Sequence, residues 1–257
     1  MGILDQKRIL ITGVLNDQSL AFATARQAQL EGAQILLTGF GRGMSITVRA
    51  ARKLDPVPEV IELDVANAEH FDGLASRIEE HFDHLDGVLH SIGFAPQACL
   101  DPDMFVAQWS DVATAIQISS YSLAPLIKAL MPLLIKGTNP SVVGLDFDAT
   151  QAWPGYNWMG VAKGALESLS RYMAREVGKQ GVRVNLISAG PIKTIAAKSV
   201  GGFSDFEAIW GERAPLGWSV TNPEPVAKSI VALMSDYFSA TTGEIIHVDG
   251  GFHAVGA

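Results

Sequence analysis

The stretch RILITGVLNDQSLAFATARQAQLEGAQILLTG, residues 8–39, decides the fold. It opens with an apolar run over 8–13, continues as an amphipathic pattern over 19–30 and ends in a second apolar run over 33–38. This pattern indicates a strand, a helix and a second strand. The helix returns the chain to the end of the sheet where the first strand began, so the second strand runs parallel to the first. The chain is therefore expected to build a parallel sheet from its first residues onward.

The same alternation continues to the end of the chain. Further strand-like runs lie at 59–63, 87–91, 141–144, 182–188 and 244–248, and helical patterns at 44–54, 69–81, 109–135, 156–178 and 223–235. This order predicts a single α/β domain over residues 1–257, a Rossmann-like doubly wound parallel sheet of about seven strands with helices on both faces. Ligands of such sheets bind beyond the carboxyl ends of the strands. The segment 192–218 has no strand pattern and is a candidate substrate-binding lid.

Composition narrows the class of protein. Of 257 residues, 48% are hydrophobic, which excludes a disordered chain, and the net charge of −8 disfavours nucleic acid and anionic membranes as partners. The one cysteine, Cys99, excludes an internal disulfide framework. We find no targeting segment, no apolar run suited to a membrane span and no convincing metal-ligand cluster. These observations predict a cytoplasmic protein without a metal.

The turn between the first strand and the first helix, residues 13–21, is where a parallel βα unit holds a pyrophosphate, because helix amino ends attract anions. Gly13, Ser19 and Leu20 are the candidates for this role. The usual glycine pattern is missing, however, and Ser19 serves equally well as a helix N-cap. After the second strand, Phe40 could stack on adenine, and no acidic residue is present for the ribose. The nearby Arg42 leaves the choice between NADH and NADPH open.

Two further strand ends carry candidates for cofactor binding. Asp64 and Val65 follow the third strand, where the carboxylate could accept a hydrogen bond from the adenine amino group. Ser91, Ile92 and Gly93 follow the fourth strand, where glycine allows the backbone to approach a cofactor closely. Each position alone is ordinary turn chemistry. Their placement on successive strand ends favours a dinucleotide site.

The candidate catalytic pair is Tyr156 and Lys163. Seven residues are nearly two turns of a helix, so both side chains are expected on one face. An ammonium beside a phenol stabilises the phenolate, so we expect the pKa of Tyr156 to lie below the usual ~10. Such a tyrosine can stabilise a developing oxyanion.

These residues resemble the short-chain dehydrogenase/reductase superfamily and, within it, the enoyl-[acyl-carrier-protein] reductases of the mycobacterial, isoniazid-target type. The long Tyr–Lys spacing and the glycine-poor first turn are typical of this branch, whereas ordinary members place the two residues four apart. The resemblance spans nearly the whole chain. Further matches are Leu37-Thr38-Gly39-Phe40, His90-Ser91-Ile92-Gly93-Phe94, Gly190-Pro191-Ile192-Lys193-Thr194 and Arg213-Ala214-Pro215-Leu216-Gly217-Trp218.

The resemblance implies an activity. NADH, more than NADPH, would deliver hydride to the β-carbon of a trans-2-enoyl thioester carried by acyl carrier protein or coenzyme A in fatty-acid elongation, with mycolic-acid elongation as one version. Tyr156 would contact the enolate oxygen, Lys163 would bind the nicotinamide ribose, and Phe147 would steer the thioester. Ile192 and Thr194 would contact the nicotinamide amide and the pyrophosphate.

The resemblance also implies an assembly. A homotetramer is expected, and three apolar residues of the 156–178 helix are candidates for its interface, although they could equally cover the chain's own sheet. Three cations around the proposed lid are expected to face the acidic carrier protein. The interface candidates are Leu166, Leu169 and Met173, and the cations are Lys193, Lys198 and Arg213.

Two departures from the mycobacterial pattern concern the acyl pocket. The segment between Thr194 and Arg213 is shorter than in that type, and Gly160 and Ala197 stand where larger residues are expected. The short segment puts a preference for very long acyl chains in doubt, and the two small residues predict an acyl pocket of a different shape. The alternative function is a short-chain dehydrogenase/reductase acting on a carbonyl or 3-oxoacyl substrate. Such an enzyme would need a serine about 13 residues before Tyr156, a position that Val143 occupies here, and the nearest serine, Ser141, lies within the expected strand.

Overall fold

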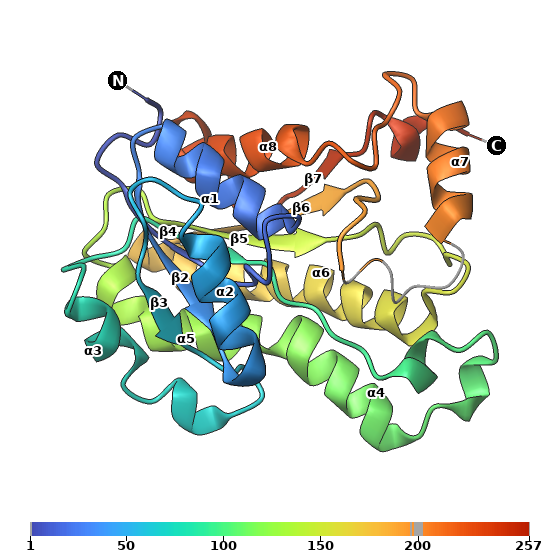
Figure 1. Ribbon diagram of the computed structural model, residues 1–257, viewed down its shortest axis with the longest axis horizontal. Coiled ribbons are helices and arrows are strands. Elements are labelled where there is room, and N and C mark those ends of the chain that lie inside the picture. The colour runs from blue at the N-terminus through green and yellow to red at the C-terminus, as the bar shows by residue number, and fades with distance from the viewer. Residues whose placement is uncertain (1, 196, 198–202, 257) are drawn as a thin grey trace.

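The computed structural model describes residues 2–195, 197 and 203–256. In this part of the chain, seven parallel strands form a sheet in the order β3-β2-β1-β4-β5-β6-β7 (Figure 1). The order reverses direction between β1 and β4, as in doubly wound folds. The prediction of an α/β parallel sheet is confirmed. The strands are β1 (Arg8–Ile11), β2 (Gln34–Gly39), β3 (Val60–Glu62), β4 (Gly87–His90), β5 (Ser141–Asp146), β6 (Arg183–Ala189) and β7 (Ile245–Val248).

Helices cover both faces of the sheet, and each face has its own apolar core. On one face, buried side chains of α1 (Leu20–Leu30), α2 (Met44–Ala51) and α8 (Glu224–Met234) pack against the strands, and Figure 1 shows α1 beside α8. On the other face, the core comes from α3 (Leu74–Glu79), α5 (Leu123–Leu134) and α6 (Asn157–Val177). The strands are near-continuous apolar runs because both of their faces are covered.

The helical pattern over 109–135 is interrupted in the structure. It divides into α4 (Trp109–Ile116), a π-helical turn (Gln117–Tyr121) and α5. The wide turn brings the buried Ser119 to Phe94, where its hydroxyl donates to the carbonyl at 2.8 Å and accepts from the amide at 2.9 Å. The turn therefore fixes the chain just after β4.

The apolar stripe of α6 serves the chain's own core. Leu166 is fully buried, and Leu169 and Met173 are partly buried against the same cluster. The alternative explanation, burial against the chain's own sheet, thus accounts for all three residues. No helix in the described residues is both long and apolar enough to span a membrane.

The segment 192–218 contains a helix that the sequence pattern did not predict, α7 (Phe203–Arg213). It lies at the end of the molecule opposite α3 (Figure 1). Two of its aromatic residues, Phe206 and Trp210, are buried. Lys198, one of the three proposed carrier-facing cations, lies outside the described residues.

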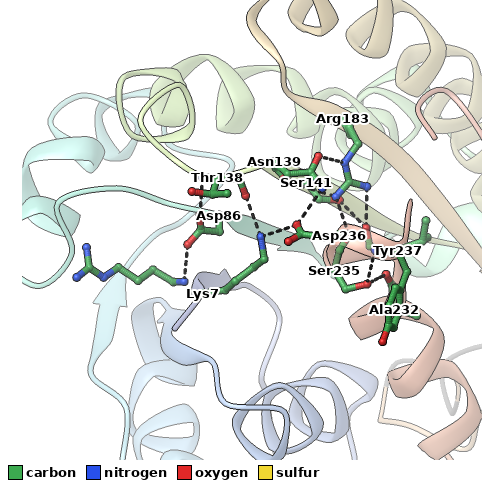
Figure 2. A network of polar contacts seen from close by, with 12 residues as sticks. Lys7, Asp86, Thr138, Asn139, Ser141, Arg183, Ala232, Ser235, Asp236 and Tyr237 are labelled. Carbon is green, nitrogen blue, oxygen red and sulfur yellow. Dashed lines mark hydrogen bonds and ion pairs between the residues drawn. The ribbon is translucent and has the colours of Figure 1, made fainter. Parts of the chain in front are cut away.

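The amino ends of the strands are joined by polar contacts (Figure 2). Lys7, just before β1, donates from Nζ to the carboxylate of Asp236 and to the carbonyl of Thr138, both at 2.9 Å. Asn139 also donates to Asp236, at 3.0 Å, and accepts from Arg183 of β6 at 3.0 Å. Segments far apart in the sequence are thus held together at this edge of the sheet.

Candidate active site

The opposite edge, at the carboxyl ends of the strands, opens into a cavity of about 860 Å³. Its wall includes residues that follow β1, β2, β3, β4, β5 and β6. The cavity brings together every residue to which the sequence assigned catalysis or cofactor binding. These residues are Gly13, Ser19, Leu20, Phe40, Asp64, Val65, Ser91, Ile92, Gly93, Phe147, Tyr156, Lys163, Ile192 and Thr194.

The turn after β1 packs closely against the chain that follows β4. Gly13 has φ of 79°, and a Cβ atom there would lie 1.8 Å from the carbonyl oxygen of Ser91. Only glycine fits this position without moving β4. The turn is braced from outside, since Asp17 pairs with Lys53, and the hydrogen bond from Lys53 lowers the pKa of Asp17.

Ser19 is the N-cap of α1. This confirms the second of the two roles that the sequence offered for Ser19, a pyrophosphate contact and a helix N-cap. Its hydroxyl accepts from the amide of Phe22 at 3.1 Å and donates to the carbonyl of Asn16 at 2.8 Å. Among the described residues, the amides of Leu20 and Ala21 have no partner. The first turn of an eleven-residue helix therefore presents free N–H groups beside the cavity, which suits an anion.

The end of β2 supplies an aromatic wall. Phe40 is 50% exposed and lines the cavity together with Arg42. Thr47 of α2, which sequence reasoning missed, donates from Oγ1 to the carbonyl of Val14 at 2.7 Å and so joins α2 to the turn after β1. Asp64 uses one carboxylate oxygen to accept from the amide of Ala66 at 2.9 Å.

Tyr156 and Lys163, which the seven-residue spacing predicted to lie on one face, both line the cavity. Tyr156 lies at the N-cap position of α6, one residue before the helix begins. Lys163 is buried and donates from Nζ to the carbonyl of Leu145, at the end of β5, at 2.7 Å. The two side chains thus line the cavity from the start of α6 and from its second turn.

The expectation of a lowered tyrosine pKa is wrong. Burial, and secondarily the negative charge of Asp146, raises the pKa of Tyr156 well above its usual value. Burial lowers the pKa of Lys163, whereas Asp146 acts in the opposite direction. The reason for the error is that spacing gives a shared face but says nothing of desolvation or of a carboxylate from β5. At neutral pH, Tyr156 is therefore a protonated hydrogen-bond donor.

Phe147 belongs to an aromatic cluster that the sequence did not reveal. Its ring meets that of Tyr156 edge-on, at 5.1 Å between centroids, and that of Trp153 at 5.5 Å. Phe206 and Trp210 of α7 lie 5.9 Å from it. These contacts join the catalytic candidates to the segment 192–218, and three of the rings, those of Phe147, Tyr156 and Phe206, line the cavity.

The residues present fit a dinucleotide. Free N–H groups at the start of α1 suit a pyrophosphate, and the half-exposed Phe40 suits a base. Elsewhere in the cavity wall, the Lys163 side chain is buried and carries an N–H donor group. Asp146 is also buried, and neither of its carboxylate oxygens has a partner among the described residues. Such donors and acceptors suit ribose hydroxyls.

A doubly wound sheet with this cavity, and with Tyr156 and Lys163 in its wall, is the arrangement expected of a dinucleotide-dependent reductase of the short-chain dehydrogenase/reductase class. Comparison with known proteins narrows the class. Residues 13–253 match the family model described as "Enoyl-(Acyl carrier protein) reductase". The chain therefore belongs to the enoyl-[acyl-carrier-protein] reductase family.

Its relatives cover nearly the whole chain. It is 47% identical to the "Enoyl-[acyl-carrier-protein] reductase [NADH]" of Mycolicibacterium smegmatis, with 97% of each chain covered, and equally so to that of Mycobacterium avium. It is 39% identical to the corresponding reductase of Aquifex aeolicus, with 100% of this chain and 94% of the relative covered. The resemblance to the mycobacterial type is thus confirmed.

Proposed function

We propose that this chain is an NADH-dependent enoyl-[acyl-carrier-protein] reductase of fatty-acid elongation, which reduces the double bond of a trans-2-enoyl thioester. The observation that carries the proposal is the placement of Tyr156, Lys163 and Phe147 in one cavity at the switch point of the sheet. Membership of the family and 47% identity to a mycobacterial NADH reductase support it.

The cofactor would lie along the strand ends. Ser19 and Leu20 at the start of α1 hold the pyrophosphate in this proposal, Phe40 stacks on the adenine, and Lys163 binds the nicotinamide ribose. When bound, NADH supplies the hydride for the β-carbon of the substrate. The remaining proposed cofactor contacts are Gly13, Asp64, Val65, Ser91, Ile92, Gly93, Ile192 and Thr194.

The chain's own contribution is positioning and charge stabilisation. Negative charge collects on the thioester oxygen as hydride adds to the β-carbon, and the Tyr156 hydroxyl would donate a hydrogen bond to this oxygen. A proton taken up from solvent at the α-carbon then completes the reduction. Its raised pKa keeps the proton on the phenol oxygen. Phe147, held by Trp153 and Phe206, borders the thioester and excludes water from it.

The segment 192–218 would act as the lid over the acyl chain. Ala197 lines the cavity, and the space beside Gly160 is bounded by the ring of Tyr156, 3.5 Å from where a Cβ atom would lie. These small residues shape the acyl pocket in the proposal. Acyl chains of ordinary length, rather than very long ones, are the proposed substrates because this segment is short.

The proposal is tested by following NADH and NADPH oxidation with trans-2-enoyl thioesters of short and long chain, on coenzyme A and on acyl carrier protein. We expect turnover with NADH and loss of turnover in Lys163→Met. Turnover with 3-oxoacyl thioesters or ketones, and none with enoyl thioesters, would refute it in favour of a carbonyl reductase.

The same assay tests carrier docking. Lys193 is exposed and lies between Ile192 and Thr194, which line the cavity, whereas Arg213 already donates to the carbonyl of Gly256 at 3.3 Å. Lys193→Glu should raise KM for carrier-linked substrate and spare the coenzyme A thioester. An equal effect on both substrates would contradict docking at Lys193.

A homotetramer in the cytoplasm completes the proposal. Val161 and Tyr172 of α6 are exposed at 44% and 64%, which leaves apolar surface on this helix for a partner copy. The mass of the protein in solution, measured by light scattering, tests the assembly. A monomer at micromolar concentration would contradict it.

A further inference from the structure

The cavity has an apolar part that the proposed cofactor does not use. The wall of this part comes from the end of β5, from α6 and from the segment 192–218. An acyl chain is apolar, so with its thioester at Tyr156 it would lie against this wall. The apolar residues concerned are Phe147, Met159, Ile195, Ala197 and Phe206.

Trp153 packs behind two of these residues. It belongs to the loop between β5 and α6, and its ring centroid is 5.5 Å from that of Phe147 and 6.0 Å from that of Phe206. It also packs against two buried rings, with centroids 5.0 Å from Trp210 and 5.7 Å from Phe252. Phe147 and Phe206 line the cavity, and the Trp153 ring forms a second layer behind them.

Hydrogen bonds of its side chain and its backbone hold Trp153 in place. Its Nε1 donates to the carbonyl of Asp148 at 2.6 Å, and its own carbonyl accepts from the amide of Tyr156 at 3.2 Å. Protein interiors are close-packed, so a ring can turn away from a ligand only where a neighbour leaves room. Because the indole is fixed in this position, the rings of Phe147 and Phe206 cannot give way to a longer acyl chain.

Trp210 packs against the same rings but has a different place in the fold. It belongs to α7 and stacks on Phe252, with ring centroids 3.9 Å apart, so its loss would loosen the helix as well as open space. Trp153 comes from the loop that leads into α6. A smaller residue at this position would therefore enlarge the acyl end of the cavity and leave the stacked pair of α7 intact.

We propose that Trp153 determines the acyl-chain length of the substrate: its indole occupies the space behind Phe147 and Phe206 into which the distal methylenes of a longer chain would extend. The inference rests on the proposed enoyl reduction, and it names the substrate class as trans-2-enoyl thioesters of limited length. It places one limit on length in the loop between β5 and α6, separate from the short segment 192–218.

The test measures kcat/KM with NADH for coenzyme A thioesters whose trans-2-enoyl chains lengthen by two carbons at a time. In the wild type, kcat/KM should fall once the chain is long enough to meet the aromatic wall. In Trp153→Leu, the ratio of kcat/KM for long and short chains should rise, by about fourfold for each methylene that becomes buried. This ratio is the informative quantity, because damage to the fold lowers kcat/KM for both lengths together.

Trp109→Leu is the matched control, since it makes the same replacement on α4 at a side chain that is 76% exposed. It should leave the ratio unchanged. Trp153→Phe, checked for folding by circular dichroism, keeps a smaller ring and should raise the ratio by less than Trp153→Leu. If Trp153→Leu does not fold, Trp153→Phe carries the test.

The same ratio in both Trp153 variants and the wild type would overturn the proposal, as would an equal rise in Trp109→Leu. A wild type whose kcat/KM does not fall for long chains would also overturn it, because the wall would then set no limit. If the wild type reduces no enoyl thioester, the proposed function itself fails and this inference fails with it. Reduction of enoyl thioesters with an unchanged ratio refutes the role of Trp153 alone.

Discussion

At the scale of single residues, the site depends on which groups keep their protons. Tyr156→Phe removes the hydroxyl that would stabilise the enolate oxygen and leaves the ring that packs against Phe147. Loss of one oxyanion donor costs about 10²-fold in kcat, so we expect a fall of that order with the Kd of NADH unchanged. Steady-state assays with an enoyl thioester, paired with fluorescence titration of NADH, measure the two effects separately.

The pKa of Tyr156 also predicts how kcat depends on pH. Because the pKa of Tyr156 is raised, its ionisation contributes no alkaline limb to kcat below the usual tyrosine value of ~10. Any alkaline limb that the wild type shows at saturating NADH should persist in Tyr156→Phe. An alkaline limb that disappears in this variant would show that the phenol ionises within the working range, and the pKa of Tyr156 would then be lowered after all.

At the scale of elements, the regular parts of the fold could be predicted from the sequence and the irregular parts could not. Apolar runs located all seven strands, and Ser19 was correctly identified as an N-cap candidate, because both signals are local. The π-helical turn at Gln117–Tyr121 was missed because a helical period continues through it.

The same limit applies to the candidate site. Residues at strand ends were predicted because parallel strands end at one edge of a sheet. Contacts of Phe206 and Trp210 with Phe147 join segments distant in sequence, which periodicity does not reveal. Asp146 was missed as a site residue because its significance lies in its missing partners, a property of the fold alone.

Helix α7 is held to the rest of the protein by a stacked pair of aromatic rings. Trp210 is 2% exposed and stacks on Phe252, with ring centroids 3.9 Å apart, so it anchors α7 to the body of the protein. Trp210→Ala should cost about 3–5 kcal/mol of local packing and release this helix. We expect KM for the enoyl substrate to rise and the Kd of NADH to stay unchanged, and limited proteolysis should cleave within 192–218. Equal loss of both affinities would mean that Trp210 supports the whole fold rather than the proposed lid.

At the scale of the whole molecule, the two edges of the sheet have different tasks. The carboxyl ends of the strands carry the cavity, with its unpaired Asp146 and its free amides at the start of α1. The amino ends carry hydrogen-bonded polar groups such as Lys7 and Arg183 (Figure 2). Polar groups at the cavity are left available for ligands, whereas those at the other edge bind one another. Substitutions at the amino edge should therefore change stability and leave cofactor binding intact.

Asp236→Asn tests this division of the molecule. Hydrogen bonds from Asn139 and Lys7 hold the pKa of Asp236 below its usual value. A carboxylate with a lowered folded-state pKa contributes stability above its unfolded pKa of ~3.9 and loses it as the pH falls through the lower folded value. Asp236→Asn should thus lower the free energy of unfolding at neutral pH by about 1 kcal/mol, since water screens a side chain that is 66% exposed.

The difference from the wild type should disappear in acid, where both carry a neutral side chain at this position. Denaturant unfolding at several pH values measures it, and NADH titration at neutral pH checks that the cavity is unaffected. Glu79→Gln, which breaks an exposed pair with Lys136 elsewhere on the surface, is the control and should cost less than about 0.5 kcal/mol. A stability loss that is independent of pH would assign the role of Asp236 to packing. A loss of NADH affinity would show instead that the two edges of the sheet are coupled, because neither Asp236 nor its hydrogen-bond partners line the cavity.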